Sequence, residues 1–180
     1  MRRTFGEVTV ELVQGDITAQ PDVDAVVNAA NAELRTGGGV AGAIHRAAGP
    51  GLAEEAVPLG PIAPGEVVLT GGHGLPNAHV LHALGPVHGR DEPADELLAS
   101  CYRRALELAD EHDLTSVAFP AISTGAFGYP LRPATEVALA TIRDVAPSLR
   151  SVRLVRMVLH GAGDLEVHED VLGSLDEPGS

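Results

Sequence analysis

Residues 23–49, "VDAVVNAANAELRTGGGVAGAIHRAAG", carry the strongest indication of the fold of this chain. It begins with a short apolar run at 23–27, which is typical of a strand buried on both faces of a sheet. Three glycines, Gly37 to Gly39, then precede the segment 40–56, which we predict to be one helix closing near Pro58. A strand, a glycine-rich loop and a helix in this order indicate an α/β domain.

The same alternation continues along the rest of the chain. Alternating or continuous apolar runs predict further strands at 7–14, 65–72, 78–86, 115–122 and 151–160. Apolar residues three and four positions apart predict helices at 91–113, 132–146 and 164–175. No repeat or linker divides the chain, so we expect a single domain over residues 1–180, with a frayed tail at 176–180.

The charge of the chain restricts the ligands that it can hold. Its 180 residues include 25 acidic and 12 basic side chains, all of the latter arginine, for a net charge of −13. Recognition of a nucleic-acid backbone needs clustered cations, so we expect no nucleic-acid partner. An anionic ligand would have to be held by backbone N–H groups and helix N-termini.

Two further classes of protein are disfavoured by the sequence. No stretch approaches 18 consecutive apolar residues, and the start of the chain lacks the pattern of a signal peptide, so we expect a cytoplasmic protein without a membrane span. The single cysteine, Cys101, lies in a helical pattern and is predicted to be a core residue. His79 and His82 lie in one predicted strand and are interpreted as structural, so no metal site and no cofactor are expected.

Three glycine-containing segments follow predicted strands, where open α/β sheets bind ligands. They are Gly15–Thr18, the loop that ends in Gly37–Gly39, and "AISTGAFGYP" at 121–130. Glycines before a helix can turn several N–H groups toward an anion, and Ser123, Thr124 and Gly125 offer hydroxyl and N–H donors. Two such loops would suit a diphosphate, although neither matches a Walker loop or G-x-G-x-x-G, and either loop could be only a flexible turn.

Five segments, in this order and spacing, resemble the macrodomain family: "VELVQGDIT", "DAVVNAAN", "GGGVAGAIHRAAG", "HVLHALGP" and "FPAISTGAFGYP". The resemblance covers about residues 7–172, which would be the core of the domain. It implies a three-layer α/β/α sandwich with a mixed, mostly parallel central sheet. It also implies a ligand, ADP-ribose, bound in a cleft at the strand ends. The implied partners are mono-ADP-ribosylated proteins, and we expect a monomer.

The resemblance also assigns roles to individual residues. Asp16 would accept a hydrogen bond from the adenine amino group, with the Ile17 backbone beside it, and Asn31 would contact the distal ribose. The diphosphate would lie between two sets of residues, namely Gly38, Gly39 and Val40 on one side and Ser123, Thr124, Gly125, Ala126 and Phe127 on the other.

Structural alternatives remain for several of these positions. Asp16 could be only a capping or turn residue, and Phe127 could be a core residue rather than a ligand-facing ring. We interpret Asn28 as a structural residue that pins the loop to the backbone, and Tyr129 as a packing residue. Leu165 stands where the family usually has an aromatic residue that stacks on adenine, which suggests an apolar contact instead.

The activity that the resemblance implies is that of the bacterial MacroD-like hydrolases, which share "GGGV..AIHRAAG". These enzymes remove mono-ADP-ribose from Asp or Glu side chains, and O-acetyl-ADP-ribose is a further possible substrate. Ala41 replaces the aspartate that usually follows GGGV, so we predict substrate-assisted hydrolysis with Asn31, Gly38, His45 and Phe127 as the catalytic set. Two alternatives stay open: one is that His45 only caps and packs its helix, and the other is that the chain is a non-catalytic ADP-ribose-binding module.

Overall fold

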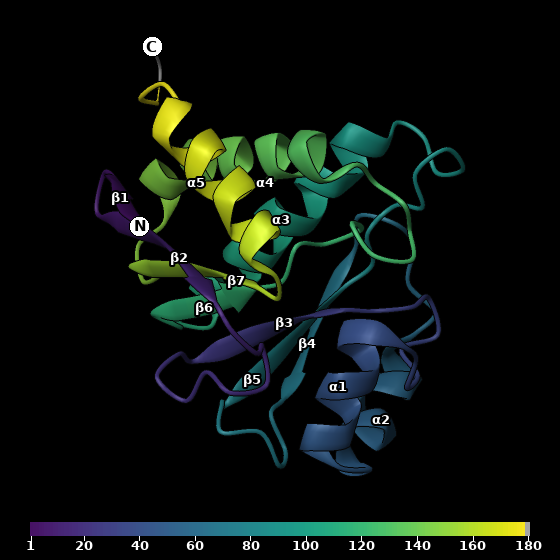
Figure 1. Ribbon diagram of the computed structural model, residues 1–180. Helices are drawn as coiled ribbons and strands as arrows, with labels where there is room; N and C mark the ends of the chain where they lie inside the picture. Colours follow the sequence, from purple (N-terminus) through teal and green to yellow (C-terminus); the bar gives the residue numbers. More distant parts are fainter. Residues whose placement is uncertain (179–180) are drawn as a thin grey trace.

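A seven-stranded sheet forms the centre of the computed structural model, which describes residues 1–178 (Figure 1). The strands are β1 (Arg2–Phe5), β2 (Val8–Gln14), β3 (Ala25–Ala29), β4 (Val67–Gly71), β5 (His79–Ala83), β6 (Ser116–Phe119) and β7 (Leu154–Leu159). The helices are α1 (Gly39–Ala48), α2 (Gly51–Ala56), α3 (Ala94–Glu111), α4 (Leu131–Val145) and α5 (Ala162–Ser174), with 3₁₀ turns at Val57–Leu59 and Ala146–Ser148.

The strands lie in the order β1-β2-β7-β6-β3-β5-β4. The five inner strands β2, β7, β6, β3 and β5 run parallel, whereas β1 and β4 pair antiparallel at the two edges. The predicted mixed, mostly parallel sheet is therefore confirmed. Because the inner strands are parallel, the loops that follow β2, β3, β6 and β7 all leave from the same edge of the sheet.

Helices cover both faces of this sheet, which confirms the three-layer α/β/α architecture. In Figure 1, α3, α4 and α5 lie above the sheet, and α1 and α2 lie below it. The larger core cluster packs Tyr102, Leu106 and Ile142 from the upper helices against the sheet. A second cluster places Ile44 and Leu52 of the lower helices against the opposite face.

The strand predicted at the start of residues 23–49 is buried, as expected. Residues Ala25 to Asn28 of β3 are all buried, as expected for a strand that helices cover on both sides. By contrast, β2 alternates buried and half-buried residues, with Val8, Val10 and Leu12 packed into the larger core cluster. None of the helices in residues 1–178 is long and apolar enough to cross a membrane.

Two predictions about the secondary structure were wrong. The segment 40–56 is not one helix, because Gly49 adopts a φ of +82° and Pro50 follows it, so α1 ends at Ala48 and α2 starts at Gly51. The chain also begins with a strand that we did not predict. β1 is short, charged and mostly exposed, and it is stabilised by pairing with β2 rather than by its own apolar pattern.

Candidate functional site

Three of the segments singled out in the sequence meet at the carboxyl edge of the sheet. Residues 15–24 follow β2, residues 30–38 follow β3 and residues 120–130 follow β6, and these strands are parallel members of one sheet. β7 lies between β2 and β6, so the first residues of α5 come to the same edge. The fold therefore brings the predicted adenine, ribose and diphosphate contacts to one side of the molecule.

Asp16 forms a turn and still has a free carboxylate oxygen. Its Oδ1 accepts hydrogen bonds from the backbone N–H of Thr18 at 2.8 Å and from the Thr18 hydroxyl at 2.7 Å. These bonds from Thr18 lower the pKa of Asp16, so the carboxylate is ionised at neutral pH. Within residues 1–178, Oδ2 has no hydrogen-bond partner, and the side chain is exposed. Both expectations for Asp16 are thus compatible: one oxygen makes the turn, and the other can accept a bond from a ligand.

Ile17 and Leu165, the other two residues predicted near the adenine, pack their side chains against the core. Ile17 is only 6% exposed and packs in the cluster under α1, so only its backbone can reach a ligand. Leu165, at the start of α5, is half-buried and packs against the main core. The apolar contact that we predicted at Leu165 stays a prediction.

Asn31 is bound to its own loop through both atoms of its amide. Its Nδ2 donates to the Arg35 carbonyl at 2.9 Å, and its Oδ1 accepts from the Arg35 N–H at 2.9 Å. An amide nitrogen carries two protons and an amide oxygen two lone pairs, so each atom can make a second bond to a ligand. The ribose contact predicted for Asn31 stays a prediction, and the structure adds a role in shaping the loop before the glycines.

The glycine run leads directly into the N-terminus of α1. Gly38 is the N-cap residue and has no side chain to cap the helix, so the N–H groups of the first turn are open to a ligand. A Cβ placed at Gly38 or Gly39 would meet no atom within 4 Å, and Gly39 has a φ of +55° that favours glycine. Val40 packs partly against the lower core. This loop can therefore present backbone donors and a positive helix end to an anion.

The second loop offers backbone donors but not the hydroxyls that we expected. The Ser123 hydroxyl donates to the Pro86 carbonyl at 2.8 Å, and the Thr124 hydroxyl donates to the Ala121 carbonyl at 2.8 Å. Both hydroxyl protons are donated inside the protein, which corrects the prediction that these hydroxyls act as donors to the ligand. Among the described residues, the N–H groups of Gly125, Ala126 and Phe127 have no hydrogen-bond partner. These three groups are available as donors to a phosphate.

Phe127 and Tyr129 differ in exposure. Phe127 is half-buried and packs against a small cluster that includes Leu34 and Leu84, so part of its ring is available to a ligand. Tyr129 is 7% exposed, with its ring centroid 4.9 Å from that of His88, which confirms the packing interpretation.

Two glycines outside the predicted site allow the glycine run and the second loop to pack closely against their neighbours. A Cβ on Gly42 would lie 2.5 Å from the Gly37 carbonyl oxygen. Gly37 can therefore lie this close to the first turn of α1 only because position 42 has no side chain. A Cβ on Gly85 would overlap the Ser123 hydroxyl. Gly85 and Ser123 follow different strands, β5 and β6, so the contact between them could not be predicted from the sequence.

His45 is a buried residue of α1. It is 5% exposed, and its two ring nitrogens are covered and have no hydrogen-bond partner within residues 1–178. Burial lowers the pKa of His45, so the ring is neutral near pH 7. This arrangement favours the packing alternative for His45 over a catalytic one. Ala41 is 5% exposed on the same helix, and no carboxylate replaces the missing aspartate there.

A chain of buried polar groups supports the strand that carries Asn28. Asn28 Nδ2 donates to His82 Nδ1 at 3.1 Å, so the His82 proton lies on Nε2, which donates to the Thr70 hydroxyl at 2.9 Å. Thr70 in turn donates to the Gly71 carbonyl. Burial, helped by the nearby His45, lowers the pKa of His82 to about 4. Asn28 and His82 are thus structural, as predicted, but Asn28 binds a side chain rather than the loop backbone.

The single cysteine lies in the core of the domain. Cys101 is fully buried, its thiol donates to the Leu84 carbonyl, and burial raises its pKa to about 12. The core position predicted for Cys101 is confirmed. In residues 1–178, no group of three or more His, Cys, Asp or Glu side chains could hold a metal ion.

Comparison with known proteins identifies the family. The family model described as "Macro domain" matches residues 27–138, which include the glycine run, Gly85 and the second loop. The chain belongs to the macrodomain family. This macrodomain is 45% identical over 168 residues to a macro domain-containing protein of Chlorobaculum tepidum, covering 93% of this chain and 97% of that protein.

Two other relatives carry names that describe a ligand or an activity. The macrodomain is 49% identical over 137 residues to the ADP-ribose glycohydrolase MACROD2 of Xenopus laevis, covering 75% of this chain and 32% of that protein. Its structure matches a variant of the Oceanobacillus iheyensis macrodomain with ADPR, with a TM-score of 0.92 and 38% identity. That match covers 96% of each chain.

Proposed function

We propose that this macrodomain binds ADP-ribose at the carboxyl edge of its sheet and hydrolyses the ester between mono-ADP-ribose and an Asp or Glu side chain. The observation that carries the proposal is the pair of backbone donor sets, at the N-terminus of α1 and at residues 125–127. In a chain with a net charge of −13, such donors are what remain to hold a diphosphate. The similarity to the Xenopus glycohydrolase and to the Oceanobacillus macrodomain with ADPR supports the choice of ligand.

The other parts of the ligand are placed by the flanking residues. The free Oδ2 of Asp16 accepts a hydrogen bond from the adenine amino group, at one end of the edge. Asn31 uses the second proton or lone pair of its amide to orient the distal ribose, and the exposed part of the Phe127 ring packs beside that sugar. The scissile ester then lies near the first turn of α1.

Hydrolysis of this ester consumes one water and releases ADP-ribose, a free carboxylate and one proton, which passes to the solvent. Neither Ala41 nor the covered nitrogens of His45 can take a proton from the water. We therefore assign the positioning of the water to a phosphate oxygen of the bound substrate, while the glycine N–H groups stabilise the charge that develops. Asn31, Gly38 and Phe127 complete the proposed catalytic set by holding the reacting sugar in place.

The test is incubation with a protein that carries mono-ADP-ribose on a Glu side chain. A protein that carries mono-ADP-ribose on a Ser side chain is the control substrate. We expect release of ADP-ribose from the Glu-linked protein and little from the Ser-linked one. Ala41→Asp should change the rate less than about threefold if the substrate supplies the positioning group. O-acetyl-ADP-ribose is a second ester to be tested in the same assay.

The second candidate function is a non-catalytic ADP-ribose-binding module, and Ala41 is the observation that favours it. Tight binding of ADP-ribose with no release from either protein would establish this module and reject the enzyme. Release only after Ala41→Asp would show that a carboxylate is required at that position. The proposal includes action in the cytoplasm as a monomer, which localisation and light scattering would test.

A further inference from the structure

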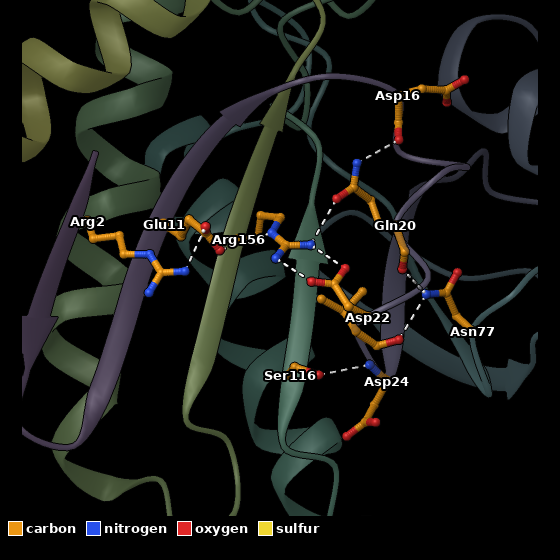
Figure 2. Close-up of polar contacts among 10 residues, drawn as sticks. Arg2, Glu11, Asp16, Gln20, Asp22, Asp24, Asn77, Ser116 and Arg156 are labelled. Atoms are coloured by element: carbon orange, nitrogen blue, oxygen red, sulfur yellow. Dashed lines mark hydrogen bonds and ion pairs between the residues drawn. The ribbon is translucent and has the colours of Figure 1, made fainter.

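A buried arginine lies under the loop that carries Asp16 (Figure 2). Arg156, on β7, is 8% exposed and pairs across the sheet with Glu11 of β2, whose Oε2 accepts from its Nε at 3.1 Å. Its two terminal nitrogens donate to the two carboxylate oxygens of Asp22 at 2.7 and 2.8 Å. A buried cation with this many bonds is held in one orientation.

Gln20 connects this arginine to the backbone of Asp16. Arg156 Nη1 donates to Gln20 Oε1 at 3.0 Å, and Gln20 Nε2 donates to the Asp16 carbonyl at 2.9 Å. Arginine can only donate and a carbonyl can only accept, so the orientation of the Gln20 amide is fixed by its two partners. A continuous chain of hydrogen bonds thus runs from a buried cation to the residue predicted to read adenine.

The remainder of the loop is fastened independently of this connection. Asn77 Nδ2 donates to the carbonyls of Gln20 and Val23, at 2.7 and 2.9 Å. The Asp24 N–H donates to the Ser116 hydroxyl at 2.9 Å (Figure 2). These bonds would keep residues 20–24 in place if the Gln20 side chain were removed. The Gln20 amide is the part that reaches forward to Asp16.

We propose that Gln20 and Arg156 are positioning residues that hold Asp16 for recognition of a 6-aminopurine. The inference rests on the proposed binding of ADP-ribose. Thr18 occupies Oδ1 of Asp16, and the Gln20–Arg156 pair holds its carbonyl, so Oδ2 is left in a fixed direction. A carboxylate that is fixed in advance distinguishes an amino group from a carbonyl better than a mobile one, because the ligand does not have to order it.

The experiment is calorimetric titration with ADP-ribose and with inosine diphosphate ribose, in which a carbonyl replaces the adenine amino group. Gln20→Met removes both side-chain bonds, while Arg156 keeps Asp22 and the Asp16 carbonyl keeps the Ala19 N–H. We expect Gln20→Met to weaken ADP-ribose binding about tenfold and inosine diphosphate ribose binding less than twofold. Asp22→Asn is the matched control, because it weakens the ion pair of Arg156 but leaves Gln20 bound to Asp16, and it should preserve the preference for adenine.

Gln20→Glu provides a second variant if Gln20→Met does not fold. It can still accept a bond from Arg156 but cannot donate to the Asp16 carbonyl, so it should lose the preference for adenine as well. An unchanged preference in the folded Gln20 variants, or an equal loss in Asp22→Asn, would overturn the inference while leaving ADP-ribose binding intact. If the unmodified protein bound neither ligand, the proposed function itself would fail.

Discussion

The side-chain amide of Asn31 is hydrogen-bonded to the N–H and the carbonyl of Arg35, both at 2.9 Å. One side chain thereby closes the loop that leads from β3 to the glycine run. The same amide is the proposed contact for the distal ribose, so loop shape and substrate orientation depend on one residue.

Asn31→Ala should slow the release of ADP-ribose from a Glu-linked substrate at least about tenfold, because the ribose loses its orienting amide and the loop loses two bonds. Single-turnover kinetics would measure this rate. Arg35→Ala is the matched control, since Arg35 contributes only backbone atoms to the pair and these remain. Equal rates for the unmodified protein and Asn31→Ala would remove Asn31 from the proposed catalytic set.

Gly38→Glu should abolish ADP-ribose binding without unfolding the protein. A Cβ at this position would meet no protein atom within 4 Å, and φ at Gly38 is −88°, so the backbone accepts the change. The carboxylate would occupy the space assigned to the diphosphate and repel it. Calorimetry measures the binding, and thermal unfolding checks the fold. Gly38→Ala adds only a Cβ, so binding should decrease far less than in Gly38→Glu; unchanged affinity in Gly38→Glu would exclude this loop from the site.

Gly85→Ala should destabilise the protein and weaken binding together. The added Cβ would overlap the Ser123 hydroxyl, which is buried against Pro86, so residues 123–127 must shift. Overpacking of this kind costs about 1–3 kcal/mol in the free energy of unfolding. Urea denaturation and calorimetry measure the two effects. Gly125→Ala is the control: its Cβ would meet no atom within 4 Å, so the free energy of unfolding should stay nearly unchanged. A similar loss of stability in both variants would contradict the role assigned to the contact between Gly85 and Ser123.

The stability of the fold should fall on mild acidification because of His82. Its pKa is about 4 in the folded protein, against an ordinary value of 6.5, so the unfolded chain takes up the proton first as the pH falls. The stabilisation is complete above pH 6.5 and is lost toward pH 4, which amounts to about 2 kcal/mol between pH 7.5 and pH 5 for this one group. The pKa values of His45 and His168 are lowered by burial too, and they add in the same direction.

Urea denaturation at several pH values would measure this dependence, with His82→Gln as the comparison. Above pH 5, the free energy of unfolding of His82→Gln should change less steeply with pH than that of the unmodified protein, by the contribution of about one proton. The carboxylates with lowered pKa values, such as Asp22 at about 2, remain ionised in this range. The same slope in both proteins would show that His82 is not the group responsible.

Local patterns in the sequence were sufficient for the framework of the fold and for the location of the site. The alternation of strands and helices predicted the three layers, and the glycines after β3 and β6 marked the edge at which a ligand would lie. Those features follow from periodicity and backbone freedom, which neighbouring residues encode. The single helix predicted for 40–56 was wrong because Gly49 and Pro50 break the helix within a pattern that otherwise favours it.

The use of individual side chains, by contrast, depends on contacts between distant parts of the chain. Ser123 looked like a free donor, but its hydroxyl turns to the Pro86 carbonyl, 37 residues away in the chain. Gln20 carried no signal in the sequence, because its partner Arg156 lies 136 residues further on. The composition alone predicts that backbone donors would have to hold any anion in this acidic chain. Which donors are free depends on hydrogen bonds between distant segments, and those form only when the sheet brings its strands together.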